Sequence, residues 1–191
     1  KFHPLTHPSE SQSLSLVAIG GFGRGEMAPY SDIDLLFLSN KRQTGWAKSV
    51  VESVLYLLWD LKFKVGHSSR TISDCVQLGL DDLTIRTSML EKRYLCGSRD
   101  LFEELETTLK KKVFSKKASN FVEGKLSERA ERHLKHANAR YMLEPNIKEG
   151  KGGLRDLHTL YWISKYIYRT DNIPVSYTHL TLPTIGEVGG A

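Results

Sequence analysis

Two aspartates separated by a single residue are the most informative chemical feature of this sequence. Asp32 and Asp34 follow a glycine-rich stretch, GGFGRGEMAPY at residues 20–30, and open the apolar run IDLLFLS at residues 33–39. Alternate side chains of a strand share a face, so the two carboxylates are predicted to point the same way. Such neighbours repel each other unless a cation lies between them, and Mg²⁺ favours oxygen ligands of this kind. We therefore predict Asp32 and Asp34 as catalytic residues that hold Mg²⁺, with two ions expected.

The glycines before the aspartates suit a phosphate-bearing ligand. Gly20 and Gly21 put no Cβ in the way of a triphosphate, and successive backbone amides can bind its oxygens. Arg24 offers a planar fork of donors, and Ser31 adds a hydroxyl, so all four are predicted to bind a nucleotide. A Rossmann fingerprint would need a glycine at Glu26, and the Lys-Ser or Lys-Thr of a Walker A loop is missing. A hairpin with two solvated acids would also contain Asp-x-Asp, but the glycine pair and the flanking apolar runs favour catalysis.

Apolar periodicity predicts the elements that must position these residues. The runs at residues 14–20 and 33–39 are typical of buried strands, and Pro29 excludes a long helix between them. Apolar residues at helical spacing predict a helix over residues 47–61. The stretch FKVGHSSRT at residues 63–71 is a candidate third strand. The order strand, loop, strand, helix, strand predicts a small domain that combines strands and helices.

These elements divide the chain into three parts. The strands and the first long helix occupy residues 10–80, and helical patterns continue over residues 81–172, ending with a helix over residues 154–168. Residues 173–191 form the third part. They carry almost no charge, have no helical period and end in small residues. We interpret this last part as a non-native or disordered tail and exclude it from the fold.

Composition limits the classes of partner. The chain has 191 residues with 27 Lys and Arg against 22 Asp and Glu, a net charge of +5. This small excess suits a phosphate-bearing ligand but gives no basis for expecting nucleic acid. Cys75 and Cys96 are too few for a disulfide framework or zinc cluster, and no run approaches the roughly 20 apolar residues of a membrane span. We expect a cytoplasmic piece of a longer protein that binds neither nucleic acid nor membrane.

A family resemblance follows from these motifs. The stretch GGFGRGEMAPYSDIDLLFL resembles the signature of the polymerase-β-like nucleotidyltransferases, in which Gly-Gly and a short helix precede Asp-x-Asp on a strand. Its finer form resembles the bacterial PII uridylyltransferase/uridylyl-removing enzymes, as do residues 58–71, 81–97 and 141–168. The resemblance implies an α+β fold: a small mixed-sheet nucleotidyltransferase domain followed by an all-helical region.

The resemblance also implies a reaction. UMP would pass from UTP to a tyrosine of the PII nitrogen-regulatory protein, with Mg²⁺ as cofactor and pyrophosphate as product. Asp32 and Asp34 would then be the metal ligands. The full-length family enzymes also carry an HD-type phosphohydrolase domain and ACT domains, which match no stretch of this chain. Two alternatives stay open: a regulatory nucleotide-binding module without transferase activity, and an inactive truncated fragment.

Three basic residues are further candidates for phosphate contacts. Arg70 lies on the candidate third strand, where a packed ion pair is an equally good interpretation. Lys151 and Arg155 lie in a glycine-containing loop that leads into the last helix, and amides at such a position can bind an anion. A well-formed turn with solvated lysines explains that loop as well.

The position of a third carboxylate is left open by the sequence. Many members of the wider superfamily place one on the next strand, where this chain has Gly66 and His67. Either two aspartates suffice, or another acid such as Asp60 completes the set. An isolated strand histidine is more often a packed structural residue than a ligand.

Overall fold

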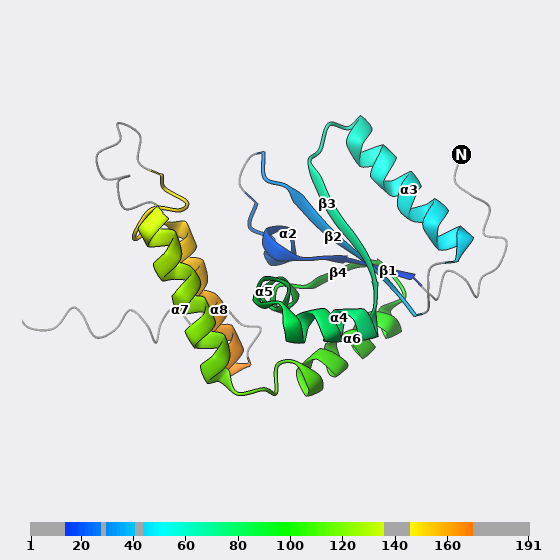
Figure 1. The fold of residues 1–191 in the computed structure, drawn as a ribbon. Coiled ribbons are helices and arrows are strands. Elements are labelled where there is room, and N and C mark those ends of the chain that lie inside the picture. Colours follow the sequence, from blue (N-terminus) through cyan, green and yellow to red (C-terminus); the bar gives the residue numbers. More distant parts are fainter. Residues whose placement is uncertain (1–13, 28–29, 41–43, 136–145, 170–191) are drawn as a thin grey trace, which may run out of the picture. The chain divides into compact units, whose positions relative to one another are not determined.

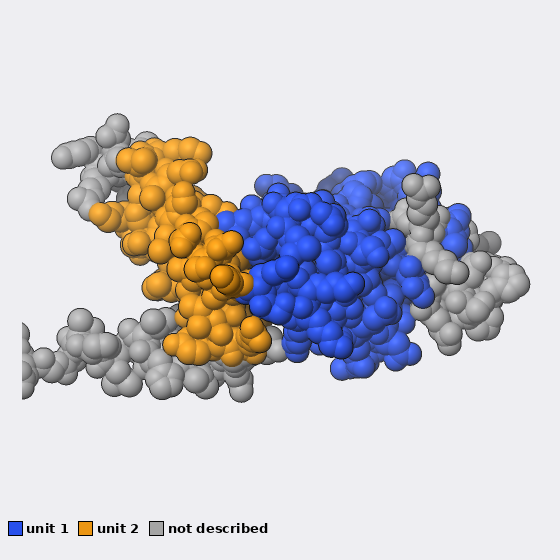
Figure 2. Space-filling view, turned by 60° about the horizontal axis from the view of Figure 1, so that its bottom comes forward, with its two compact units in different colours: residues 1–116 blue, residues 117–191 orange. Residues whose placement is uncertain are grey.

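The computed structural model describes residues 14–27, 30–40, 44–135 and 146–169 (Figure 1). The chain divides into two compact units, residues 1–116 and 117–191, which are coloured separately in Figure 2. The strands are β1 (Leu14–Ala18), β2 (Ile33–Ser39), β3 (Val65–Thr71) and β4 (Arg93–Gly97). The helices of the first unit are α2 (Gly20–Arg24), α3 (Gly45–Asp60), α4 (Ile72–Asp81), α5 (Leu83–Leu90) and α6 (Arg99–Lys112). The second unit contains α7 (Ala118–Lys135) and α8 (Leu154–Tyr168).

The four described strands form one mixed sheet in the order β3-β2-β1-β4. β1 pairs antiparallel with both β2 and β4, whereas β2 and β3 run parallel. The parallel pair needs a crossover connection, and α3 provides it. A mixed sheet with helices packed on it confirms the predicted α+β class.

The two faces of the sheet have different partners. Leu35 and Phe37 of β2 pack with Val51 and Leu55 of α3 in one apolar cluster. In Figure 1, α3 lies on one side of the sheet, and α4 and α6 lie on the other. Alternation along β2 therefore puts Asp34 on the side opposite α3, on the same face as its fully buried neighbours further along the strand.

The first unit extends well beyond the 10–80 domain that the sequence predicts. β4 lies inside the region expected to be all-helical, and it pairs with β1 at the edge of the sheet. This strand has only five residues and is half-exposed, so it lacks the apolar alternation that reveals β1 and β2. The sequence therefore predicts that the preceding helix continues through these residues, but that helix ends at Leu90. The predicted tail at 173–191 lies outside the described residues.

The helices of the second unit pack antiparallel. Phe121, near the start of α7, stacks on Tyr166 near the end of α8, with ring centroids 4.1 Å apart. At the other end, Arg132 and His133 of α7 contact Asp156 in the first turn of α8. The helix predicted for residues 154–168 is confirmed.

Candidate active site

The Asp34 carboxylate lies between two glycines from different elements. Gly66 of β3 is directly opposite Asp34 in the parallel pair, and a Cβ there would be 2.5 Å from Asp34 Oδ1. Gly20 opens α2 with a φ of +58°, and a Cβ there would be 3.0 Å from Asp34 Oδ2. Only glycine adopts such a φ readily, and only glycine leaves this room. The two glycines therefore create the space that the carboxylate occupies.

Asp32 is close enough to act on Asp34 electrostatically. Burial raises the pKa of the Asp34 carboxyl, and the negative charge of Asp32 raises it further. Both effects disfavour the ionised form, so a nearby cation would relieve the repulsion. Two neighbouring carboxylates are the oxygen ligands that a divalent ion takes when phosphate also binds it. The adjoining glycine has no Cβ and leaves space beside them.

The residues considered for a third carboxylate do not supply one. Gly66 provides space rather than a ligand, and His67 is on the α3 side of the sheet, where its ring packs edge-on against Trp59 at 6.4 Å. Asp60 ends α3, also on that side. Within the described parts of the chain, no group of three or more His, Cys, Asp or Glu side chains could hold a metal ion. Asp32 and Asp34 thus stay the two predicted acidic ligands.

Arg24 has a different partner from the one expected. Its guanidinium pairs with Glu91, and the side chains are only 8% and 2% exposed. Its Nε also lies 3.6 Å from the carboxylate of Glu26. The contacts described for the side chain of Arg24 are within the protein, and its contact with a nucleotide stays a prediction. The sequence does not predict the pairing of Glu91 with Arg24, because no local pattern indicates a contact between residues 67 positions apart.

The other predicted nucleotide contacts stay compatible with their proposed role. Ser31 directly precedes Asp32, and both are exposed. Gly21 follows Gly20 in α2, and the nearest atom to a Cβ built on Gly21 is 3.8 Å away, on Arg24. The structure thus brings Asp32, Asp34, Gly20 and Gly21 together at one place, with Ser31 adjoining Asp32.

Arg70 lies at the other end of the sheet. It is opposite Leu38 in the parallel pair, four residues beyond the Gly66–Asp34 position. Four residues of strand span about 13 Å, so Arg70 is not part of the aspartate site. The charge of Arg70 instead acts on the buried thiol of Cys75, whose pKa is raised to about 11, mainly by burial.

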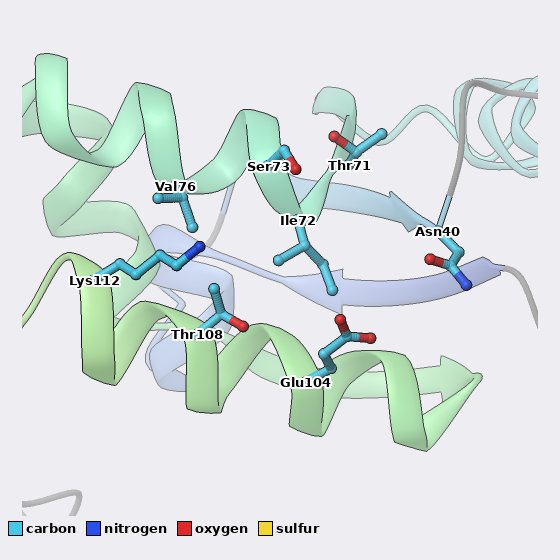
Figure 3. A pocket seen from close by; sticks show the side chains of 8 residues that line it. All are labelled: Asn40, Thr71, Ile72, Ser73, Val76, Glu104, Thr108 and Lys112. Carbon is cyan, nitrogen blue, oxygen red and sulfur yellow. The ribbon is translucent and has the colours of Figure 1, made fainter.

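A polar pocket of about 330 Å³ lies near that end of the sheet, between α4 and α6 (Figure 3). Thr71, Ile72 and Ser73 at the start of α4 form one wall, and Glu104, Thr108 and Lys112 of α6 face them. Neither aspartate of the candidate site lines this pocket. The pocket and the aspartate site are therefore separate features of the first unit.

The loop before α8 is organised by contacts within the second unit. Arg155 lies 3.4 Å from Glu149, and its guanidinium is 5.7 Å from the ring centroid of Trp162. The amide of Gly152 donates a hydrogen bond of 2.8 Å to Asp156. These contacts support the turn interpretation for Arg155, whereas the exposed Lys151 stays a candidate phosphate contact.

Asp156 is the centre of this network. Burial alone would raise its pKa, but hydrogen bonds from the Gly152 amide, Arg132 and His133 outweigh burial and lower the pKa to about 2. A depressed carboxyl pKa means that the ionised form is stabilised by folding. The stabilisation is complete above the unfolded value near 3.8 and is lost as the pH falls from there through about 2.

Asp156→Asn is expected to lower the stability of the α7–α8 unit by roughly 2 kcal/mol at pH 7, because the change removes that charge from three donors. Thermal unfolding followed by circular dichroism, at pH 7 and at steps down to pH 2, measures the effect. Glu131→Gln, an exposed carboxylate change on α7, is the matched control and should have little effect. A difference in Tm between Asp156→Asn and the parent that is the same at all pH values would contradict the lowered pKa of Asp156.

Within the described residues, no helix combines the length and the apolar character that a membrane crossing requires.

Comparison with known proteins agrees with this geometry. Residues 8–95 match the family model of the nucleotidyltransferase domain, so the chain carries such a domain in the unit that contains the aspartate site. Residues 120–185 match the model described as GlnD PII-uridylyltransferase.

Two curated relatives carry the same name. The chain is 58% identical, over 166 residues and 87% of its length, to the bifunctional uridylyltransferase/uridylyl-removing enzyme of Ruegeria pomeroyi. It is 54% identical, over 169 residues and 88% of its length, to the enzyme of that name from Cereibacter sphaeroides. The chain spans 18% of the length of each of these relatives. It is therefore homologous to a segment of the bifunctional uridylyltransferase/uridylyl-removing enzymes.

Proposed function

We propose that this chain catalyses the Mg²⁺-dependent transfer of UMP from UTP to a tyrosine of the PII protein, with release of pyrophosphate. The observation that carries the proposal is the position of the Asp34 carboxylate, between Gly20 and Gly66 and within electrostatic reach of Asp32. The names of the relatives and the PII-uridylyltransferase model support the choice of UTP and PII. Both cysteines are free, which is compatible with the reducing cytoplasm that we propose as its location.

In this reaction, the tyrosine oxygen forms a bond to the α-phosphorus of UTP. The bond between that phosphorus and the bridging oxygen of the β-phosphate breaks, the phenolic proton is released, and pyrophosphate leaves. The contribution of the protein is to fix the reacting groups in line and to stabilise the charge that develops. Gly20 and Gly21 would let the phosphate chain approach the backbone, and Ser31 would add a hydroxyl contact.

Asp32 and Asp34 would hold the Mg²⁺ ions. When bound, the ions supply positive charge that balances the carboxylates and the phosphate oxygens of the substrate. The raised pKa of Asp34 is consistent with a site that gains from such charge. β2 holds Asp34 at a fixed position, because the next residues of the strand are fully packed in the sheet.

One experiment tests directly which nucleotide is the donor. The purified chain is incubated with PII, Mg²⁺ and UTP labelled at the α-phosphate, and in parallel with labelled ATP, CTP or GTP. We expect label on PII from UTP at a rate at least tenfold above that from ATP, and no label when EDTA removes the metal.

Other outcomes of this comparison have distinct meanings. Equal labelling from ATP and UTP would contradict the selectivity for UTP as the donor. Binding of UTP without transfer, measured by calorimetry, would favour the regulatory nucleotide-binding module. A chain that neither binds UTP nor transfers label would be the inactive fragment.

A further inference from the structure

The short helix α2 is held by residues that come 67 to 71 positions later in the chain. Glu91, the residue directly after α5, pairs through its carboxylate with Arg24 in the last turn of α2. Arg93 of β4 donates hydrogen bonds to the carbonyls of Phe22, at 2.7 Å, and Gly23, at 3.1 Å. These carbonyls belong to the last turn of α2, where the Phe22 carbonyl also accepts a hydrogen bond of 3.2 Å from the amide of Gly25.

Steric contact reinforces these polar contacts. A Cβ on Gly23 would lie 1.7 Å from the carbonyl oxygen of Glu91, so the two backbones are in direct contact. The guanidinium of Arg93 also lies over the ring of Phe22, 5.3 Å from its centroid. Glu91 therefore contacts α2 twice, through its side chain and its backbone, and Arg93 contacts it through two carbonyls and a ring.

The other end of α2 adjoins the aspartate site. Ile19, the residue before the helix, donates its backbone N–H to the carbonyl oxygen of Asp34 at 3.1 Å. Gly20, the first residue of α2, borders the Asp34 carboxylate, since a Cβ there would be 3.0 Å from Oδ2. A displacement of α2 would therefore change the space around that carboxylate.

We propose that Glu91 and Arg93 are positioning residues of the transferase site: they hold α2, and α2 fixes the surroundings of the Asp34 carboxylate. The inference rests on the proposed function, because it assigns these residues to the same reaction. It also gives a role to residues 81–97, a stretch that resembles the uridylyltransferases but carries no residue of the candidate site. In this assignment Arg24 acts through Glu91 rather than on the nucleotide.

Arg93→Gln is the first test, because Arg93 is exposed and its removal leaves no buried charge. The matched control is Arg99→Gln, since Arg99 is also exposed and pairs with Glu103 within α6. In the UTP-to-PII assay with the 191-residue chain, Arg93→Gln is expected to lower kcat about tenfold, with less than a twofold change in the KM for UTP. Arg99→Gln is expected to match the parent. Equal kcat values for the two variants would overturn the proposal.

A double-mutant cycle separates the two interpretations of Arg24. If Arg24→Gln and Glu91→Gln each lower kcat/KM about tenfold through the same contact, the double variant stays near tenfold rather than about a hundredfold. If Arg24 instead binds the nucleotide, the two effects multiply, and the KM for UTP rises in Arg24→Gln alone. That second result would overturn the assignment of Glu91.

A readout that needs no activity separates this inference from the proposed function. Amide hydrogen exchange of residues 20–25 is expected to be at least tenfold faster in Glu91→Gln and Arg93→Gln than in the parent or Arg99→Gln. If the parent transfers no label, the proposed function fails, and the exchange rates still decide whether these residues hold α2. Unchanged exchange in both variants would overturn the inference even if the parent is active.

Discussion

The Asp34→Asn variant is expected to lose uridylyl transfer while keeping its fold. Asparagine has the shape of aspartate, so it fits the same space between Gly20 and Gly66. It carries no charge, and a weakened hold on Mg²⁺ would remove stabilisation of the transition state. We expect kcat/KM to fall by about 10² to 10³-fold, the size seen when one strong electrostatic contact to the transition state is lost. Transfer of label from UTP to PII measures this loss.

The stability of Asp34→Asn should change in the opposite direction to its activity. Because the folded protein raises the pKa of Asp34, the ionised carboxylate is disfavoured in the fold. In the absence of metal, the parent therefore becomes less stable as the pH rises from 3.8 through the raised folded value. Asparagine avoids this loss, so at pH 7 without metal the variant should have a Tm equal to or above that of the parent.

Addition of Mg²⁺ should reverse that order. The ion is expected to bind the folded parent and raise its Tm, whereas the Tm of Asp34→Asn should change little. Asp81→Asn is the matched control, since Asp81 is exposed at the end of α4 and accepts a hydrogen bond from Gln77. Full transfer activity in Asp34→Asn, or an equal response of all three proteins to Mg²⁺, would refute the assignment of Asp34 as a metal ligand.

The parts of the site that follow from local pattern were predictable from the sequence. The two-residue period of a strand places Asp34 on a defined face of β2, and the apolar run IDLLFLS coincides with the strand in the structure. The glycine pair before it indicates a tight connection, and α2 begins at Gly20. These features depend on residues within a few positions of one another, so the period and the turn chemistry suffice.

The parts that depend on contacts between distant segments were not predictable. Arg24 has the chemistry of a phosphate ligand, and nothing near it in the sequence reveals that Glu91 is its partner. β4 is short and half-exposed, so only its pairing with β1 identifies it as a strand. Gly66 occupies a strand position where many superfamily members have a third carboxylate. In this structure, the lack of a Cβ at Gly66 leaves room for the Asp34 carboxylate. Each correction involves a partner far along the chain, which periodicity alone does not supply.

The Gly23→Ala variant is expected to be strongly destabilised, in contrast to Gly21→Ala. A Cβ on Gly23 would be 1.7 Å from the carbonyl oxygen of Glu91 and 3.0 Å from that of Ala18, so backbone would have to move. Overpacking typically costs about 1–3 kcal/mol, and a contact this short with backbone is expected at the upper end of that range, about 3 kcal/mol. For a unit of this size, that corresponds to a fall in Tm of roughly 10 °C or more, which calorimetry would detect.

Gly21→Ala is the matched variant two positions earlier in the same helix. The nearest atom to its new Cβ would be 3.8 Å away, an ordinary contact, and alanine favours a helix by up to about 1 kcal/mol over glycine. Its Tm should therefore equal or exceed that of the parent. If the phosphate chain of UTP lies along Gly21, the same methyl group should raise the KM for UTP while the fold is unaffected. Equal Tm values for Gly23→Ala and Gly21→Ala would contradict the close contact between α2 and Glu91, on which the proposed positioning role of Glu91 depends.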